Sequence, residues 1–388
     1  MGVLRRLRRS LVTVLLVAVA GLAAPAPALA AGLEPVTSFG SNPGNLAMYV
    51  YRPDALPAGS PAVVLLHGCT QNAAGYFANS GWRKFADQAK FALVLPEQRS
   101  ANNSSSCFNW FAAGDTARDQ GEALSVRQMV DRAVTAYGLD RSRVFVSGLS
   151  AGGAMSAVML ATYPDVFAAG SVVAGLPYRC ATSLSQASGC QYTPPDRTPA
   201  QWGDLVRGAY PGYGGPRPRV AIWQGQADYT VVPANGVELR DQFTNVLGVP
   251  VQPTSTSSLP AGTTLEVYGA DQVRLYRVAG MGHGTPVDPG SAAEQCGTAA
   301  AYFLDTICSA YRDAVFFGLA TGGSGPGEPE PPVPACVTAT NYAHVQAGRA
   351  YVSGGYAYAQ GSGQRMGLYN VFTSTQLCEQ SPGHWVIG

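Results

Sequence analysis

The stretch VFVSGLSAGGAM, residues 144–155, decides the fold class of this chain. An apolar run (144–146) leads through Gly148-Leu149-Ser150-Ala151-Gly152 into a segment of small residues. G-x-S-x-G between a strand and a helix is the pattern of a sharp turn that exposes a serine hydroxyl, with glycines leaving room for the strained backbone. The alternative is a glycine-rich turn with an incidental serine. The strand before the turn and the helix after it favour a nucleophile.

The segments around this turn alternate between strand-like and helical patterns. Seven short runs, mostly apolar throughout, read as strands: AMYVY (47–51), AVVLLHG (62–68), FALVLPEQ (91–98), RVFVSG (143–148), GSVVAG (170–175), RVAIWQG (219–225) and VRLYRVAG (273–280). Helices are expected at about 78–89, 119–137, 152–163 and 235–246, with a longer one at 293–317. Strands that are apolar on both faces indicate a mostly parallel sheet covered by helices. The pattern therefore predicts an α/β domain.

Composition divides the 388 residues into four segments. We expect a signal peptide at 1–30, a catalytic α/β domain at 31–320, a Gly/Pro-rich linker at 321–335 and a small β-rich module at 336–388. The linker, TGGSGPGEPEPPVPA, has too much glycine and proline for a packed core. Cys336 and Cys378 bracket the last segment, and a disulfide is the kind of link that so small a unit needs.

The first 30 residues have the pattern of a secretory signal. Four arginines between residues 5 and 9 precede the apolar run LVTVLLVAVAGLAA (11–24), and APALAAG (26–32) offers an A-x-A cleavage site. The alternative is a membrane anchor, but the run is shorter than the about 20 residues that span a bilayer. We expect cleavage after Ala30, with Ala31 as the alternative position, and a soluble, secreted, extracellular chain.

The eight cysteines all follow this signal. An even number in an exported chain favours disulfides over free thiols. Local spacing favours Cys180–Cys190, Cys296–Cys308 and Cys336–Cys378, which leaves Cys69 with Cys107, although sequence alone does not fix the connectivity. Zinc is the alternative; it is disfavoured because no C-x-x-C pair occurs and the four histidines are scattered.

The charge balance limits the classes of partner. A net charge of +1 and 13% charged residues give no electrostatic basis for binding nucleic acid or an anionic membrane. Nothing in the sequence calls for a cofactor or a metal, and we expect a monomer.

A serine at this type of turn predicts an acid and then a histidine further along the chain. Asp228 follows the buried run RVAIWQG, and His283 lies in the glycine-flanked loop VAGMGHGTPVD. His283 is the only histidine between the turn and the linker. Asp204 and Asp271 are alternatives to Asp228, but its position directly after a strand favours Asp228. The expected roles are nucleophile for Ser150, general base for His283 and orienting acid for Asp228.

An oxyanion hole is expected from two backbone N–H groups. One belongs to Ala151, directly after the nucleophile, and the other to Cys69 in the His67-Gly68-Cys69 turn that ends an early strand. A Cys69–Cys107 link would hold this loop rigid. We expect the His67 side chain to make supporting hydrogen bonds and not to act as acid or base.

Several motifs together resemble the extracellular poly(3-hydroxybutyrate) depolymerase family of α/β-hydrolases. They are LLHGCTQNAAGYFANSGWRKFADQAKFALVLPEQ, CFNWF, DRSRVFVSGLSAGGAMS and WGDLVR, and the resemblance spans about 38–317. The order, oxyanion loop before nucleophile, resembles the type with an N-terminal oxyanion histidine, here His67. The resemblance implies an α/β-hydrolase fold and a secreted serine esterase with Ser150, Asp228, His283 and the 67–69 loop in the family's roles.

The segment NYAHVQAGRAYVSGGYAYAQGSGQRMGLYNVF (341–372) is similar to the short polyester-binding domain of these depolymerases. That similarity implies an insoluble polyester as substrate. Feruloyl and acetylxylan esterases share the LHGC and GxSxGG features, so a carbohydrate esterase with a polysaccharide-binding tail stays an alternative. A non-catalytic polymer-binding protein and a peptidase are alternatives of other classes.

Aromatic residues are the candidates for substrate contact. Trp110, Trp202 and Trp223 are candidates for the acyl pocket, although large aromatics of such domains are more often core. Tyr356 and Tyr358 point to the same side of an extended strand, and a Gly354-Gly355 turn would bring Tyr351 beside them. They form either the small core of the module or an exposed aromatic platform, with the two alternatives evenly balanced.

Overall fold

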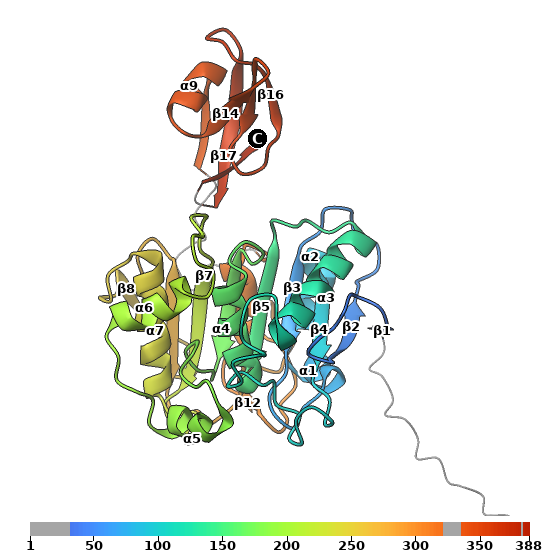
Figure 1. The fold of residues 1–388 in the computed structure, drawn as a ribbon, viewed down its shortest axis with the longest axis vertical. Coiled ribbons are helices and arrows are strands. Elements are labelled where there is room, and N and C mark those ends of the chain that lie inside the picture. Colours follow the sequence, from blue (N-terminus) through green and yellow to red (C-terminus); the bar gives the residue numbers. More distant parts are fainter. Residues whose placement is uncertain (1–31, 321–334, 382) are drawn as a thin grey trace, which may run out of the picture.

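The computed structural model describes residues 32–320, 335–381 and 383–388 (Figure 1). The signal predicted over 1–30 and nearly all of the linker predicted over 321–335 lie outside these residues, so both stay predictions. None of the described helices is long and apolar enough to cross a bilayer.

A ten-stranded sheet forms the centre of residues 32–320. In spatial order its strands are β1 (Leu33–Val36), β2 (Ala47–Tyr51), β4 (Ala92–Glu97), β3 (Ala62–Leu66), β5 (Val144–Leu149), β6 (Ala169–Val173), β7 (Arg219–Gly225), β10 (Val273–Val278), β9 (Thr263–Tyr268) and β8 (Ser255–Leu259). The run from β4 to β10 is parallel, and both edges are antiparallel. The predicted α/β class and mostly parallel sheet are confirmed.

Helices cover both faces of this sheet, which is why strands such as β3 and β5 are buried along their whole length (Figure 1). One face packs on α3 (Gly121–Tyr137), α4 (Ala151–Thr162), α6 (Pro199–Arg207) and α7 (Ala234–Leu247). The other packs on α1 (Ala73–Asn79), α2 (Trp82–Ala89) and α8 (Ser309–Phe316). The remaining elements are α5 (Leu184–Tyr192) and the paired β11 (Thr285–Val287) and β12 (Phe303–Asp305).

The helix predicted at about 78–89 corresponds to α2, which begins at Trp82, and a separate helix, α1, precedes it. The chain turns between α1 and α2 at Gly81, which has a φ of 84°. A Cβ at this position would lie 2.5 Å from the Cys296 sulfur. The break therefore depends on a residue more than two hundred positions away, which local periodicity does not reveal.

The long helix predicted at 293–317 is wrong except for α8. The Lys84 ammonium donates to the carbonyl oxygens of Ala292, Ala293 and Gln295. These carbonyls are bound by a side chain instead of by helical N–H groups. Cys296 is also tied to Cys308, so the chain between them is closed into a loop that contains β12.

Residues 335–388 have sheets and a core of their own. One sheet contains β13 (Ala335–Thr340), β17 (Ser374–Ser381) and β18 (His384–Ile387), and the other β14 (Ala350–Ser353), β15 (Tyr356–Ala359) and β16 (Arg365–Leu368). The helix α9 (Asn341–Gln346) completes the module. Its core consists of small apolar side chains: Ala350, Ala357, Ala359, Met366 and Leu377. The predicted β-rich character of this segment agrees with the structure.

Four disulfides join the eight cysteines in the pairing that local spacing favours. They are Cys69–Cys107, Cys180–Cys190, Cys296–Cys308 and Cys336–Cys378. Cys336 and Cys378 are directly opposite each other on β13 and β17. This bond therefore links the strands of the small module where they already pair.

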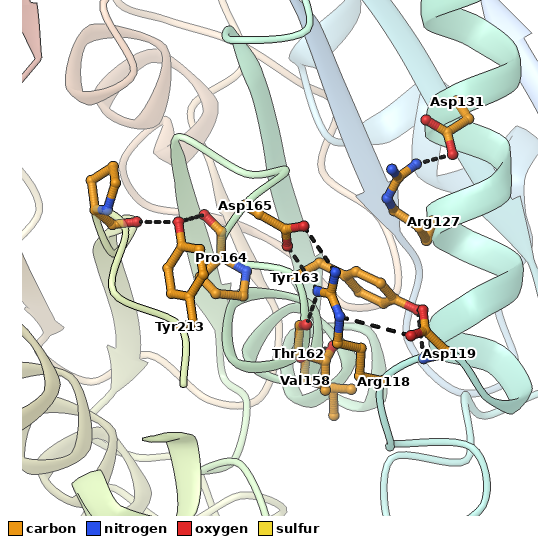
Figure 2. A network of polar contacts seen from close by, with 11 residues as sticks. Arg118, Asp119, Arg127, Asp131, Val158, Thr162, Tyr163, Pro164, Asp165 and Tyr213 are labelled. Atoms are coloured by element: carbon orange, nitrogen blue, oxygen red, sulfur yellow. Dashed lines mark hydrogen bonds and ion pairs between the residues drawn. The ribbon is translucent and has the colours of Figure 1, made fainter. Parts of the chain in front are cut away.

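Arg118 holds the C-terminal end of α4, the helix that follows Ser150 (Figure 2). Its guanidinium donates to the Thr162 carbonyl at 2.6 Å and to both carboxylate oxygens of Asp165 at 2.8 and 2.9 Å. It also lies over the rings of Tyr163 and Tyr210, at 4.7 and 3.8 Å from their centroids. A cation at this end satisfies a terminal carbonyl and complements the helix dipole.

We expect Arg118→Ala to lower the free energy of unfolding by about 2 kcal/mol, because it removes a partly buried guanidinium and its two hydrogen bonds to the Asp165 carboxylate. Arg118→Lys keeps the charge but not the two-pronged geometry, so it should recover less than half of this loss. Arg141→Ala is the control, since its ion pair with Asp131 is exposed and should contribute less than about 1 kcal/mol. Denaturant unfolding measures all three. Equal stability of Arg118→Ala and Arg141→Ala would contradict the assignment.

Candidate active site

Ser150 sits on a strained turn between β5 and α4. Its φ of 57° and ψ of −117° lie where side chains other than glycine are rarely found. The backbone N–H of Ser150 donates to the Val173 carbonyl of β6 at 2.9 Å, which fixes the turn to the neighbouring strand. Ser150 is 8% exposed, and its hydroxyl has no hydrogen-bond partner among the described residues. This is the geometry that the G-x-S-x-G pattern predicts.

Glycines make this turn possible because other backbone segments approach it closely. A Cβ at Gly152 would lie 2.1 Å from the Leu66 carbonyl oxygen at the end of β3. A Cβ at Gly148 would lie 2.4 Å from the Gly152 carbonyl oxygen, and one at Gly153 2.7 Å from that of Val173. The end of β3 therefore lies directly against the first turn of α4. That contact brings the 67–69 loop to Ser150.

His283 and Asp228 are joined by a hydrogen bond between His283 Nδ1 and Asp228 Oδ2 of 2.8 Å. Asp228 is 1% exposed, and its other oxygen accepts the N–H groups of Thr230 and Val231 at 2.8 and 2.9 Å. These bonds hold the carboxylate in one orientation. A base whose ring is oriented by a buried carboxylate is the arrangement found in Ser-His-Asp hydrolases.

The alternatives to Asp228 have other partners. Asp204 pairs with Arg207 on the surface, and Asp271 pairs with Arg219 and Arg274. Only Asp228 among the three is bonded to His283 in the described structure.

The loops that carry Asp228 and His283 meet because β7 and β10 are parallel neighbours. A Cβ at Gly225 would lie 2.4 Å from the Met281 carbonyl oxygen, so the two loops touch through this glycine. The Ala174 N–H after β6 donates to the Trp223 carbonyl of β7 at 2.8 Å. Ser150 is bonded to β6 in turn, so one hydrogen-bonded series of strand ends supports all three residues.

Two backbone N–H groups are placed as candidate oxyanion donors. Ala151 is the first residue of α4, so its N–H has no partner inside the helix. The Cys69 N–H likewise has no hydrogen-bond partner among the described residues, whereas its neighbours Gly68 and Thr70 donate to Gln71 Oε1 and the Ser105 carbonyl. Cys69 is tied to Cys107, as expected.

The His67 side chain lies behind the candidate oxyanion loop, and both of its ring nitrogens are already bonded within the protein. It is fully buried; its Nδ1 donates to the Gly68 carbonyl at 2.7 Å, and its Nε2 accepts the Gln98 backbone N–H at 3.1 Å. Burial lowers the pKa of His67 to about 4, so the ring is neutral and has one tautomer that suits both bonds. The supporting role expected of this residue agrees with these contacts.

The three tryptophans occupy different places. Trp223 is a core residue and not a pocket wall: it is fully buried, stacks on Tyr276 and donates to Asp313 on α8 at 2.8 Å. Trp110 and Trp202 belong to an apolar cluster that includes Ala151, directly after Ser150. Trp202 is 0% exposed and Trp110 is 6% exposed, so Trp110 is the better candidate for substrate contact.

The three tyrosines predicted to contact substrate, Tyr351, Tyr356 and Tyr358, are not among the buried core residues of the C-terminal module. Tyr351 and Tyr358 are paired across β14 and β15, and their rings stack with centroids 5.6 Å apart. Tyr356 lies on the same side of β15 as Tyr358, with the Arg365 guanidinium 3.8 Å from its ring centroid. The alanines that alternate with them are buried on the opposite side. We name Tyr351, Tyr356 and Tyr358 the tyrosine face.

Two exposed tyrosines beside the catalytic candidates escaped the sequence analysis. Tyr229 follows Asp228 and is 84% exposed, and Tyr302 is 45% exposed with its ring 6.3 Å from that of His283. The position of Tyr229 directly after the acid was a usable signal. Tyr302 was hidden because its segment was assigned to a helix. Glu122, a buried acid in the first turn of α3, is a third residue that the sequence does not mark as functional.

Comparison with known proteins identifies the family of this chain. The family model of the esterase PHB depolymerases matches residues 45–267, which is more than half of the chain. The chain belongs to the PHB depolymerase esterase family. It is a carboxylic-ester hydrolase, and its fold is that of the α/β-hydrolases.

Relatives of this esterase are named for two kinds of ester. It is 53% identical over 292 residues to the poly(3-hydroxyalkanoate) depolymerase C of Paucimonas lemoignei, covering 74% of this chain and 70% of the relative. It is 39% identical over 270 residues to an acetylxylan esterase of Coprinopsis cinerea, covering 68% and 72%. Among solved structures, an acetyl xylan esterase from Aspergillus awamori superposes with a TM-score of 0.65 at 29% identity, covering 74% of this chain and 99% of that one.

Proposed function

We propose that this esterase is secreted and hydrolyses the ester bonds of poly(3-hydroxybutyrate)-type polyesters with Ser150, His283 and Asp228. The observation that carries the proposal is the His283–Asp228 hydrogen bond, and it is supported by the strained turn that holds Ser150. The resemblance to a named polyhydroxyalkanoate depolymerase supports the choice of polymer. The four disulfides fit an oxidising, extracellular location.

The proposed mechanism has two steps. In acylation, His283 removes the Ser150 proton as the oxygen attacks the ester carbonyl; the same proton is given to the leaving alkoxide. In deacylation, His283 activates a water that hydrolyses the acyl-enzyme and restores the serine. Asp228 orients the ring and stabilises its cationic form. The N–H groups of Ala151 and Cys69 stabilise the oxyanion of both tetrahedral intermediates, at about 3 kcal/mol for each donor.

We further propose that residues 336–388 bind the solid polymer through the tyrosine face. Tyrosines present a large, rigid contact area at low entropic cost, and Tyr351 is 44% exposed. Leu368, paired with Tyr356 across β15 and β16, adds an apolar side chain that is 52% exposed. A face of this kind suits a flat apolar solid. A hydrolase that works on such a solid must stay at its surface between turnovers.

An acetylxylan or feruloyl ester is the second candidate substrate, because the acetylxylan esterase relatives share the catalytic fold. Incubation with a turbid poly(3-hydroxybutyrate) suspension separates the two candidates. Clearing of the suspension, with little acetate released from xylan or ferulate from its methyl ester, supports the polyester. Rapid acetate or ferulate release without clearing would support the carbohydrate ester. A protein that only binds polymer would do neither, and Ser150 would fail to react with a fluorophosphonate probe.

A further inference from the structure

Glu122 is a buried acid outside the proposed triad. It lies in the first turn of α3 and is 1% exposed. Its carboxylate accepts N–H bonds from the Asn109 backbone and the Asn109 side chain, both at 2.8 Å, and from the Gln98 side chain. All three groups that reach it are donors. A carboxylate is the only common side chain of this size that can accept from all of them at once.

Two hydrogen-bonded routes lead from Glu122 to the candidate oxyanion loop. In the first, the Gln98 backbone N–H binds His67 Nε2 at 3.1 Å, and His67 Nδ1 binds the Gly68 carbonyl. In the second, Gln98 Nε2 donates to the Cys107 carbonyl at 3.0 Å, and Cys107 is linked to Cys69. Both routes pass through Gln98 and end on the residues that flank the Cys69 N–H.

Gln98 is held in one orientation by its other contacts. Its Oε1 accepts from the Arg99 backbone and from the Asn102 side chain at 3.0 and 2.9 Å, so the amide cannot turn over without breaking bonds at both ends. The residue itself is 3% exposed. Because the network is buried, solvent does not readily replace a lost partner. Loss of an acceptor oxygen at Glu122 would therefore leave the Gln98 amide unpaired and displace it.

Burial of this acid is costly. Burial and the nearby charge of Asp115 raise the pKa of Glu122, and its N–H partners counteract this rise in part by favouring the carboxylate. An apolar residue at this helix position would avoid the cost. The desolvation cost of this carboxyl group therefore indicates that it has a role in the protein. Its hydrogen bonds connect it to the 67–69 loop.

We propose that Glu122 is a positioning residue, which through Gln98 fixes the His67–Cys69 loop so that the Cys69 N–H is aimed at the ester oxyanion. The inference deepens the proposed function and rests on it for the catalytic readout. Glu122 does not touch the substrate. Its effect is on the placement of a donor, and a donor displaced by a fraction of an ångström loses much of its value in the transition state.

Glu122→Gln tests the proposal with almost no change of volume. Whichever way the new amide is turned, its NH2 group faces at least one donor. We expect kcat on p-nitrophenyl butyrate to fall roughly 10- to 100-fold with KM within about threefold, because the loop acts on the transition state. Asp313→Asn is the matched control: Asp313 is also a buried acid, but it bonds Trp223 on the α8 side of the sheet. It should keep kcat within about twofold at temperatures below unfolding.

Hydrogen–deuterium exchange of both variants supplies a readout that does not need activity. We expect the Glu122→Gln variant to exchange faster at residues 68–71 than wild type, and the Asp313→Asn variant to match wild type there. Unchanged kcat together with unchanged exchange in Glu122→Gln would overturn the inference while leaving the proposed function intact. Equal losses of kcat in both variants would also overturn it, since the effect would then be general destabilisation. If wild type hydrolysed no ester, the proposed function would fail, and the exchange comparison would still decide the role of Glu122.

Discussion

Replacing Ser150 by alanine is expected to lower kcat on a soluble ester by on the order of 10⁵- to 10⁶-fold, since the acyl-enzyme can no longer form. The turn itself should persist, because alanine tolerates the same backbone geometry about as well as serine. The unfolding temperature should therefore stay within about 2 °C of wild type. Hydrolysis of p-nitrophenyl butyrate, calorimetry and labelling with a fluorophosphonate probe measure the three consequences.

Ser147→Ala is the matched control for this variant. Ser147 lies on β5, the strand that leads to Ser150; it is 1% exposed, and its hydroxyl has no hydrogen-bond partner within the described residues. Removing an unpaired buried hydroxyl should leave kcat unchanged and stability equal or slightly higher. More than about 1% residual activity in Ser150→Ala, or labelling that persists in it, would place the nucleophile elsewhere.

The central strands and the nucleophile turn were readable from sequence because their determinants are local. β3 is apolar throughout, β5 and β7 are mostly apolar, and Gly148 to Gly152 is a contiguous pattern. The chain order Ser, Asp, His then leaves few residues that could be the acid and the base of the predicted triad. The edge strands were missed for the opposite reason. β8 is the polar segment STSSL, exposed along most of its length, and nothing apolar marks it as a strand.

Features that depend on contacts between residues far apart in the sequence could not be predicted from local sequence patterns. The 293–317 segment has helical composition, but Lys84 and the Cys296–Cys308 bond impose another path. Glu122 has the pattern of an ordinary acid in the first turn of a helix. Only the fold places Gln98 and Asn109 on its carboxylate, so the sequence alone does not reveal its proposed link to the 67–69 loop.

The tyrosine face gives the second large effect. In the full-length chain, replacing Tyr351, Tyr356 and Tyr358 together by alanine should weaken adsorption to poly(3-hydroxybutyrate) particles by about 3 kcal/mol, or roughly 100-fold in dissociation constant. Clearing of the suspension should slow by at least about tenfold at low enzyme concentration, since unbound enzyme does not reach the solid. Hydrolysis of a soluble ester should stay within about twofold of wild type, because the proposed triad belongs to other elements.

Folding of the module must be checked in this variant. The core beneath the face is made of Ala350, Ala357, Ala359, Met366 and Leu377, none of which is changed. The Cys336–Cys378 bond is also retained. Resistance of the module to trypsin, measured against wild type, shows whether it has unfolded. Full adsorption by a folded triple-alanine variant would remove the tyrosine face from the proposal.

The triple Tyr→Phe variant then distinguishes the kind of solid. Phenylalanine keeps the ring area and removes only the hydroxyl groups. A polyester chain offers carbonyl acceptors but no hydroxyl groups along its length, so adsorption that depends on ring area should survive this change. A polysaccharide presents hydroxyl groups throughout, and a face built for it would lose the hydrogen bonds that its tyrosine oxygens make. Retained adsorption to poly(3-hydroxybutyrate) therefore supports a polyester as the natural solid. Adsorption to xylan that is abolished by Tyr→Phe would instead assign the face, and with it the esterase, to the plant cell wall.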